Sequence, residues 1–202
     1  MNVKIGYTTQ FIAAVWWDGR LIMSTYDVTF KLITAGMDPA NTNTALDRLK
    51  YMVEEYLIDT VFVNHTEIDQ IKKLKAAGIN VIIMPEEPVD QILGMMLYSK
   101  LSAVMEGHIL IRSVMLSSTA GDGVIYEHES MESIAPFDQP GWWNSTDPHC
   151  EMQTKRNPDK VFVITATNQW RDLGLEWIDN DNKHTEDGNV LVFTEFKKNE
   201  DK

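Results

Sequence analysis

Apolar and polar residues alternate along the first part of the chain in the manner of β-strands. Three stretches rich in β-branched and aromatic residues cover positions 3–9, 11–17 and 20–32. Asp18-Gly19, between the last two stretches, is typical of a two-residue hairpin turn. The pattern therefore predicts an antiparallel meander of three strands at the N-terminus.

From residue 44 onward the apolar positions recur every three to four residues, which indicates a helix. Thr44 and Asp47 have the spacing of a capping box at its start. A strand, a helix, a second strand and a further helix are then expected over residues 61–63, 66–77, 79–84 and 88–107. Because each return to the sheet passes through a helix, these strands should be parallel neighbours. Residues 1–107 are thus predicted to form an α/β domain with a mixed sheet.

The second half of the chain is predicted to be richer in strands. Strand-like stretches occupy residues 109–118, 123–128, 160–167 and 190–196. The long segment 129–158 is dense in Pro, Asn, Ser and Asp, and the sequence leaves open whether it is an ordered plug or a mobile loop. We expect residues 108–202 to be a β-rich acidic extension packed on the α/β domain.

The order of elements over residues 1–107 resembles the ribonuclease H-like fold. Within that fold, the stretch "LKAAGINVIIM" (74–84) is similar to the dinitrogenase iron-molybdenum cofactor-binding family, which has a Leu-rich helix, a Gly-Ile turn and an apolar strand there. The functional motifs of these families are not matched. Nucleases of this fold need clustered carboxylates for two metal ions, and the first strand, "VKIGYTT", has none. The cofactor-binding family would have a His or Cys near the start, whereas the first His here is His65.

Charge and cysteine content narrow the classes of function. The formal net charge is −12, with 12 acidic and 9 basic residues in positions 1–100 and 18 and 9 in positions 101–202. This acidic second half disfavours direct binding to nucleic acid, because phosphate backbones attract basic surfaces. The single Cys predicts a cytoplasmic protein, and the absence of a long apolar run predicts that it does not contact membranes. A homo-oligomer is possible.

Metal and catalytic motifs are not predicted. Asp147, His149, Cys150 and Glu151 are metal-ligand types, but zinc sites need pairs of ligands with further ligands elsewhere, and the other histidines are scattered. A nucleophile elbow and a phosphate-binding glycine loop are both missing from the sequence. We therefore expect no metal, no cofactor and no catalytic residues.

The tryptophans are the strongest remaining signal. Adjacent residues of a strand face opposite sides of the sheet, so one of Trp16 and Trp17 must leave the core side. We expect the pair Trp142 and Trp143 to lie in a loop that covers it, as a plug with one exposed ring. Tryptophan also dominates the energetic centres of protein interfaces, so the same residues are candidates for partner contact.

Three hypotheses about function follow. The first is a non-catalytic binding or regulatory protein that engages a macromolecular partner through an acidic, Trp-bearing surface containing Trp17, Trp142, Trp143, Asp147 and His149. The second is a carrier of a small ligand or metallocofactor, using the crevice at the carboxyl ends of the parallel strands near Asn64, His65 and Pro85. The third is a hydrolase with dispersed acidic residues such as Asp27, Asp38 and Glu127.

Overall fold

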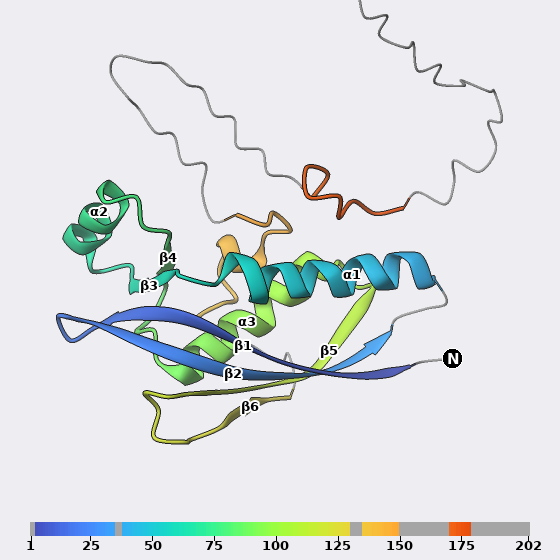
Figure 1. Ribbon diagram of the computed structural model, residues 1–202, viewed down its shortest axis with the longest axis horizontal. Coiled ribbons are helices and arrows are strands. Elements are labelled where there is room, and N and C mark those ends of the chain that lie inside the picture. Colours follow the sequence, from blue (N-terminus) through green and yellow to red (C-terminus); the bar gives the residue numbers. More distant parts are fainter. Residues whose placement is uncertain (1–2, 35–37, 130–134, 150–169, 179–202) are drawn as a thin grey trace, which may run out of the picture.

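A mixed six-stranded sheet with helices on both faces organises the protein (Figure 1). The computed structural model describes residues 3–34, 38–129, 135–149 and 170–178. In chain order the elements are β1 (Lys4–Trp17), β2 (Arg20–Thr34), α1 (Pro39–Tyr51), the π-helical turn η1 (Met52–Tyr56), β3 (Val61–Asn64), α2 (Ile68–Ala76), β4 (Val81–Met84), α3 (Asp90–Met105), β5 (Ile109–Ser118), β6 (Tyr126–His128) and the 3-10 turn η2 (Trp142–Asn144).

The N-terminal meander has two long strands, so the prediction of three strands is wrong. Residues 4–17 form one continuous strand, because Gln10 continues the alternation of exposed and inward positions and its amide donates to Asp27 across the hairpin at 2.5 Å. The predicted turn is confirmed, since Asp18 and Gly19 both have positive φ values, of 48° and 72°. Positive φ at both central residues is what a tight hairpin turn requires.

The strand order across the sheet is β4-β3-β1-β2-β5-β6. β1, β3 and β4 are parallel neighbours, whereas β2, β5 and β6 continue the sheet with antiparallel pairings. The predicted α/β class, with a mixed sheet and two parallel strands joined through helices, is therefore confirmed. The ribonuclease H-like order is not confirmed, because the place beside β2 belongs to β5, which comes after residue 107.

The two faces of the sheet are covered to different extents. One face packs against α1 and α3, and the core there is built around Phe30, Leu49, Phe62 and Leu101, all fully buried. On the other face, α2 places Ile71 over a smaller cluster from β1, β3 and β4. Of the helices in the described residues, none is long and apolar enough to span a membrane.

The middle of the second face, away from α2 and from the hairpin turn, carries polar cross-strand pairs. Thr8 and Thr29 are hydrogen-bonded at 3.0 Å between their hydroxyl oxygens, and Lys31 pairs with Glu127 at 2.7 Å. Cross-strand polar pairs of this kind suit a sheet surface in contact with water.

Helix α1 begins earlier than predicted. Its N-cap is Asp38, whose side chain accepts hydrogen bonds from the backbone N–H groups of Ala40 and Asn41, with Pro39 at the first helical position. Thr44 lies inside the helix, where its hydroxyl donates to the carbonyl of Ala40. The predicted capping box is wrong because Asp38 and Pro39 together form a stronger start signal.

The predicted strands at 160–167 and 190–196 lie outside the described residues.

Replacing Gly19 with Ala should destabilise the hairpin. At φ 72° an added Cβ has no neighbour within 4 Å, so the cost comes from backbone conformation alone, about 1–2 kcal/mol. Gly6→Ala is a matched control, since Gly6 has equally open surroundings and no positive φ. Urea unfolding should show a lower free energy of unfolding only for Gly19→Ala. Equal effects of the two substitutions would contradict this account of the turn.

Candidate functional site

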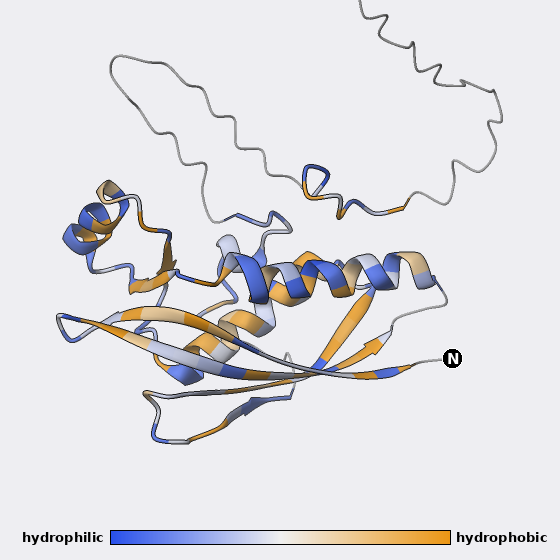
Figure 2. Ribbon diagram, viewed as in Figure 1, coloured by the Kyte–Doolittle hydropathy of each residue, from blue (hydrophilic) through white to orange (hydrophobic). Residues whose placement is uncertain are grey.

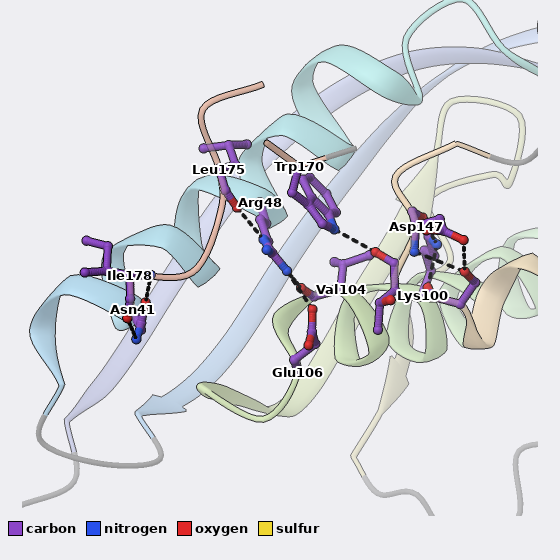
Figure 3. Close-up of polar contacts among 11 residues, drawn as sticks. Asn41, Arg48, Lys100, Val104, Glu106, Asp147, Trp170, Leu175 and Ile178 are labelled. Atoms are coloured by element: carbon purple, nitrogen blue, oxygen red, sulfur yellow. Dashed lines mark hydrogen bonds and ion pairs between the residues drawn. The ribbon is translucent and has the colours of Figure 1, made fainter. Parts of the chain in front are cut away.

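The side chain of Lys100, on α3, is buried and connects the helix to the 137–149 segment (Figure 3). Its Nζ donates hydrogen bonds to the backbone carbonyls of Trp142, Ser145 and Asp147, at 3.0, 2.7 and 2.5 Å. The same ammonium lies 4.5 Å from the centre of the Trp142 ring. Because a buried charge is costly unless its hydrogen bonds are satisfied, Lys100 holds this segment in place.

Aromatic rings surround this attachment. The ring of Tyr56, at the end of η1, lies 5.6 Å from that of Trp142 and 5.1 Å from that of His149. Burial and then the charge of Lys100 hold the pKa of His149 below its ordinary value. His149 Nε2 is buried without a hydrogen-bond partner among the described residues. The ring of His149 is thus part of the packing around Lys100.

A second buried cation, Arg48 of α1, holds the 170–178 segment (Figure 3). Its guanidinium lies 3.7 Å from the ring centre of Trp177 and 4.6 Å from that of Trp170. Its Nε donates to the Leu175 carbonyl at 2.8 Å, and its Nη1 pairs with Glu106 at 2.8 Å. Trp170 in turn donates from Nε1 to the carbonyl of Thr146 at 2.7 Å, so the two segments contact each other.

Four of the five predicted partner-contact residues are involved in these internal contacts. Trp142, Asp147 and His149 are brought together around Lys100. Trp143 packs edge-on against Phe137 and donates from its indole nitrogen to the carbonyl of Gln139. Both rings of the 142–143 pair are partly buried against the main core, which differs from the expected plug with one exposed ring.

Trp17 is the predicted contact residue that lies apart from the others. It is exposed at the end of β1, whereas Trp16 packs into the smaller core cluster with α2. The prediction that one of these two rings leaves the core side is therefore confirmed. The pair Trp142 and Trp143 belongs to the main cluster on the other face and does not cover Trp16.

Exposed apolar side chains gather on one face of the β1–β2 hairpin, and Trp17 is exposed on the opposite face. Ile12, Leu21 and Met23 point to one face of the sheet, as their register with Thr25, Trp16 and Ala14 requires. Together with Trp17 they are between 47% and 58% exposed, and we call these four residues the hairpin surface. Figure 2 shows the apolar stretches of the hairpin behind its hydrophilic turn.

The β5–β6 turn also exposes apolar side chains, those of Val124 and Ile125. The turn begins beside the hairpin, because the hydroxyl oxygens of Thr119 and Ser24 lie 2.9 Å apart. Exposed apolar side chains grouped on one face, as Ile12, Leu21 and Met23 are, are a mark of an interaction site.

The residues of the predicted ligand crevice lie at one end of the parallel strands. Asn64 ends β3 beside Met84 of β4, and His65 next to it is exposed. The Asn64 amide donates to Glu87 at 2.9 Å, and its oxygen accepts from the N–H and hydroxyl of Thr66. These bonds order the β3–α2 connection and occupy the side chain that would contact a ligand. Pro85 is partly buried in the next connection.

The acidic residues of the hydrolase hypothesis are not gathered. Asp38 caps α1, while Asp27 and Glu127 lie on the polar sheet face, bonded to Gln10 and Lys31 respectively. In the described part of the chain there is no group of three His, Cys, Asp or Glu side chains that could hold a metal ion. Cys150 and Glu151, considered above as metal-ligand types, lie outside the described residues.

Comparison with known proteins gives structural neighbours only. No family model matches the chain, and no curated protein sequence matches it. An uncharacterised protein, WS1659 from Wolinella succinogenes, is similar with a TM-score of 0.46 and 12% identity, covering 65% of this chain and 99% of that one. A 6-pyruvoyltetrahydropterin synthase from Plasmodium vivax has a TM-score of 0.43 and 8% identity, covering 64% and 98%. The Plasmodium falciparum enzyme has a TM-score of 0.41 and 12% identity, covering 64% and 99%.

These neighbours correct the family resemblance inferred from the sequence. They are not ribonuclease H-like domains or dinitrogenase iron-molybdenum cofactor-binding domains, so that resemblance is wrong. The stretch 74–84 gave a wrong resemblance because its features are only the end of a helix, a Gly at φ 78° and an apolar strand. Any α/β protein can use this combination to leave a helix and enter the sheet.

Sequence reasoning missed Lys100 and Arg48, which organise the two segments. Lys100 did carry a signal, because it is the sole charged residue between Asp90 and Glu106 in an otherwise apolar helix. A lone cation in such a position is expected to find acceptors inside the protein. Arg48 has no comparable signal, since its helix also contains Asp47 and Lys50.

Removing the Lys100 ammonium should destabilise the 137–149 segment. Lys100→Met keeps the apolar stem but removes the donor to the carbonyls of Ser145 and Asp147, while the Trp142 carbonyl keeps the Ser145 N–H, and each partly buried acceptor left unsatisfied costs about 1–3 kcal/mol. We expect a lower free energy of unfolding and faster proteolytic cleavage within the segment. Lys72→Met, at an exposed position of α2, is the control and should change neither. Normal resistance to proteolysis in Lys100→Met would rule out this role.

The buried histidine should make stability depend on pH. Because the pKa of folded His149 lies below 6.5, the unfolded chain binds a proton that the folded state rejects. The free energy of unfolding should therefore fall as the pH drops below about 6.5. His128, whose pKa burial also lowers, adds to the same trend.

His149→Gln should make this fall shallower, as measured by urea unfolding between pH 7 and pH 5. His65→Gln changes an exposed histidine and should leave the slope as it is in the parent protein. A His149→Gln profile parallel to that of the parent would show that His149 does not titrate in this way.

Proposed function

We propose that the protein is a non-catalytic binding or regulatory protein that engages a protein partner through the hairpin surface. The observation that carries the proposal is the grouping of Ile12, Leu21 and Met23, which are exposed on one face of a long hairpin, with Trp17 exposed at the hairpin end on the opposite face. Polar cross-strand pairs lie farther along the face that holds the three aliphatic residues. Exposed Trp and aliphatic side chains at one end of a hairpin have the composition of an interface centre.

The charge of the chain supports a basic partner. A net charge of −12 attracts basic surfaces over long range and repels nucleic acid. Binding is therefore expected to weaken as ionic strength rises. Trp142, Trp143, Asp147 and His149 act in the proposal as internal supports, and Trp17 is the predicted residue that remains in the contact surface.

The same proposal locates the protein in the cytoplasm. A chain with one Cys has no internal disulfide, which suits a reducing compartment. The carrier and hydrolase hypotheses find less support, since the Asn64 side chain is occupied and the three acidic residues lie apart or are paired.

The test compares two variants of the full chain as baits for partners in an extract of the native cells. Trp17→Ala/Met23→Gln removes the ring and one aliphatic group, and should reduce recovery of the partner about tenfold or more, since interface anchors each contribute over about 1 kcal/mol. Leu110→Gln removes an equally exposed apolar side chain on β5 and should keep recovery unchanged. Quantitative mass spectrometry measures both.

Two results would contradict the proposal. One is full recovery of the partner with Trp17→Ala/Met23→Gln, and the other is an equal loss with Leu110→Gln. A loss of binding that accompanies unfolding of the double variant is recognised by its circular dichroism, and Met23→Gln alone then replaces it in the same comparison.

A further inference from the structure

The outer side of β1 is open over much of its length (Figure 1). β1 has 14 residues, whereas β3 beside it has 4 and pairs only with the stretch 14–16. Among the described residues, no strand pairs with the outer side of positions 4–10, which we call the β1 edge. It contains no Pro, its pairing with β2 has no bulge, and its one charged residue, Lys4, stands at its end. Folded proteins commonly protect an open edge with such features, so the β1 edge is a template for another strand.

The outward backbone groups of the β1 edge belong to its even-numbered residues. Just beyond the edge, the carbonyl of Ile12 and the N–H of Ala14 point away from β2 and bond to the residues that lead into β3, at 3.0 and 2.9 Å. Because the backbone groups of successive strand residues point to alternate sides, those of Gly6, Thr8 and Gln10 point the same way as those of Ile12 and Ala14. An added strand would bond to these groups.

The side chains of the β1 edge differ between the two faces of the sheet. Thr8 and Gln10 stand on the uncovered face and bond across to β2. Tyr7 and Thr9 stand on the helix-covered face, where both hydroxyls donate to Oε1 of Glu54 in η1, that of Thr9 at 3.1 Å. Burial and then the bond to Glu54 raise the pKa of Tyr7 to about 12, so its phenol keeps the proton that it donates.

Glu54 is a carboxylate that is held beside the edge and exposed to solvent. Oε1 accepts both hydroxyl bonds, and Oε2 has no hydrogen bond or ion pair with the described residues. In an antiparallel addition, the residues opposite Tyr7 and Thr9 would have their side chains on the face of Glu54, with Cβ atoms about 5 Å from those of β1. A Lys or Arg at these positions meets a fixed negative charge, whereas an acidic side chain there is repelled.

We propose that the β1 edge is a peptide-binding site, and that it takes an extended basic segment of a partner protein by antiparallel strand addition. The main chain of the segment bonds to Gly6, Thr8 and Gln10, and its cationic side chains, at alternate positions, meet Glu54. The net charge of −12 attracts such a segment over long range.

The β1 edge is separate from the hairpin surface, because Trp17, Leu21 and Met23 all lie outside positions 4–10. Trp17→Ala/Met23→Gln should therefore bind a peptide at the β1 edge as the parent does. The two proposals thus fail independently.

The probe is a synthetic peptide of seven residues, blocked at both ends, in which Thr alternates with Lys and Thr stands at both ends. Antiparallel pairing places its Thr main chain against the outward backbone groups and its Lys side chains on the face of Glu54. Fluorescence anisotropy at low ionic strength measures its affinity for the full chain. A second peptide with Pro in place of each Thr has the same charge but lacks those N–H donors, and should bind about tenfold or more weakly.

Two pairs of variants test the protein. Thr8→Pro removes an outward N–H that β2 does not use and should weaken binding about tenfold or more, whereas Thr8→Val removes only the hydroxyl and should bind as the parent does. Glu54→Gln should weaken binding about threefold, the effect of an exposed ion pair. Glu55→Gln makes the same change of charge at an exposed neighbour whose charge acts on Tyr51, and should have a smaller effect.

Three results would overturn the proposal. The first is equal affinity for the Thr–Lys and Pro–Lys peptides, and the second is an equal effect of Glu54→Gln and Glu55→Gln, which would indicate attraction by net charge alone. The third is a parent dimer in sedimentation that folded Thr8→Pro does not form, because a second copy would then occupy the edge. Circular dichroism establishes that Thr8→Pro is folded. If it is not, the comparison of the two peptides on the parent decides the question without it.

Discussion

Two buried cations, Lys100 and Arg48, need hydrogen-bond acceptors, and this need positions the 137–149 and 170–178 segments over the helices. Removing an ammonium or guanidinium from water costs several kcal/mol unless acceptors replace the lost hydration. Lys100 obtains its acceptors from three carbonyls of the 137–149 segment, and Arg48 from Leu175, Val104 and Glu106. Segments distant in the sequence are thereby held on α1 and α3 without joining the sheet.

Tryptophan has two different roles in this arrangement. Trp142, Trp170 and Trp177 cover the two cations with their ring faces, an electrostatically favourable contact that also excludes water. Trp17 instead is exposed at the end of the β1–β2 hairpin. The same residue type therefore supports internal attachment at one place and offers a contact surface at another, and burial separates the two roles.

The uncovered face of the sheet changes in character toward the hairpin turn. Where the sheet lacks a covering helix, its exposed side chains form polar cross-strand pairs such as Lys31 with Glu127. Toward the hairpin turn this pattern stops, and Ile12, Leu21 and Met23 follow on the same face. An exposed apolar group favours contact with a partner, because its burial releases water from apolar surface.

The sequence alone determined the local elements whose signals are short-range. The Asp18-Gly19 turn, the presence of three helices and the strands predicted over 61–63 and 109–118 follow from periodicity and from residues that adopt positive φ. The candidate contact role of Trp17 also came from the sequence, since two adjacent strand residues cannot share one face. It remains a prediction for the partner to test.

Only the tertiary structure decided which strands are neighbours and which polar groups meet. The place of β5 beside β2, and the carbonyls around Lys100, depend on contacts between residues far apart in the chain, which local pattern does not encode. Arg48 looks like an ordinary surface residue of an amphipathic helix until Trp170 and Trp177 close over it. The physical reason is that a charged side chain can be buried wherever distant segments supply its acceptors, and the sequence does not specify where that happens.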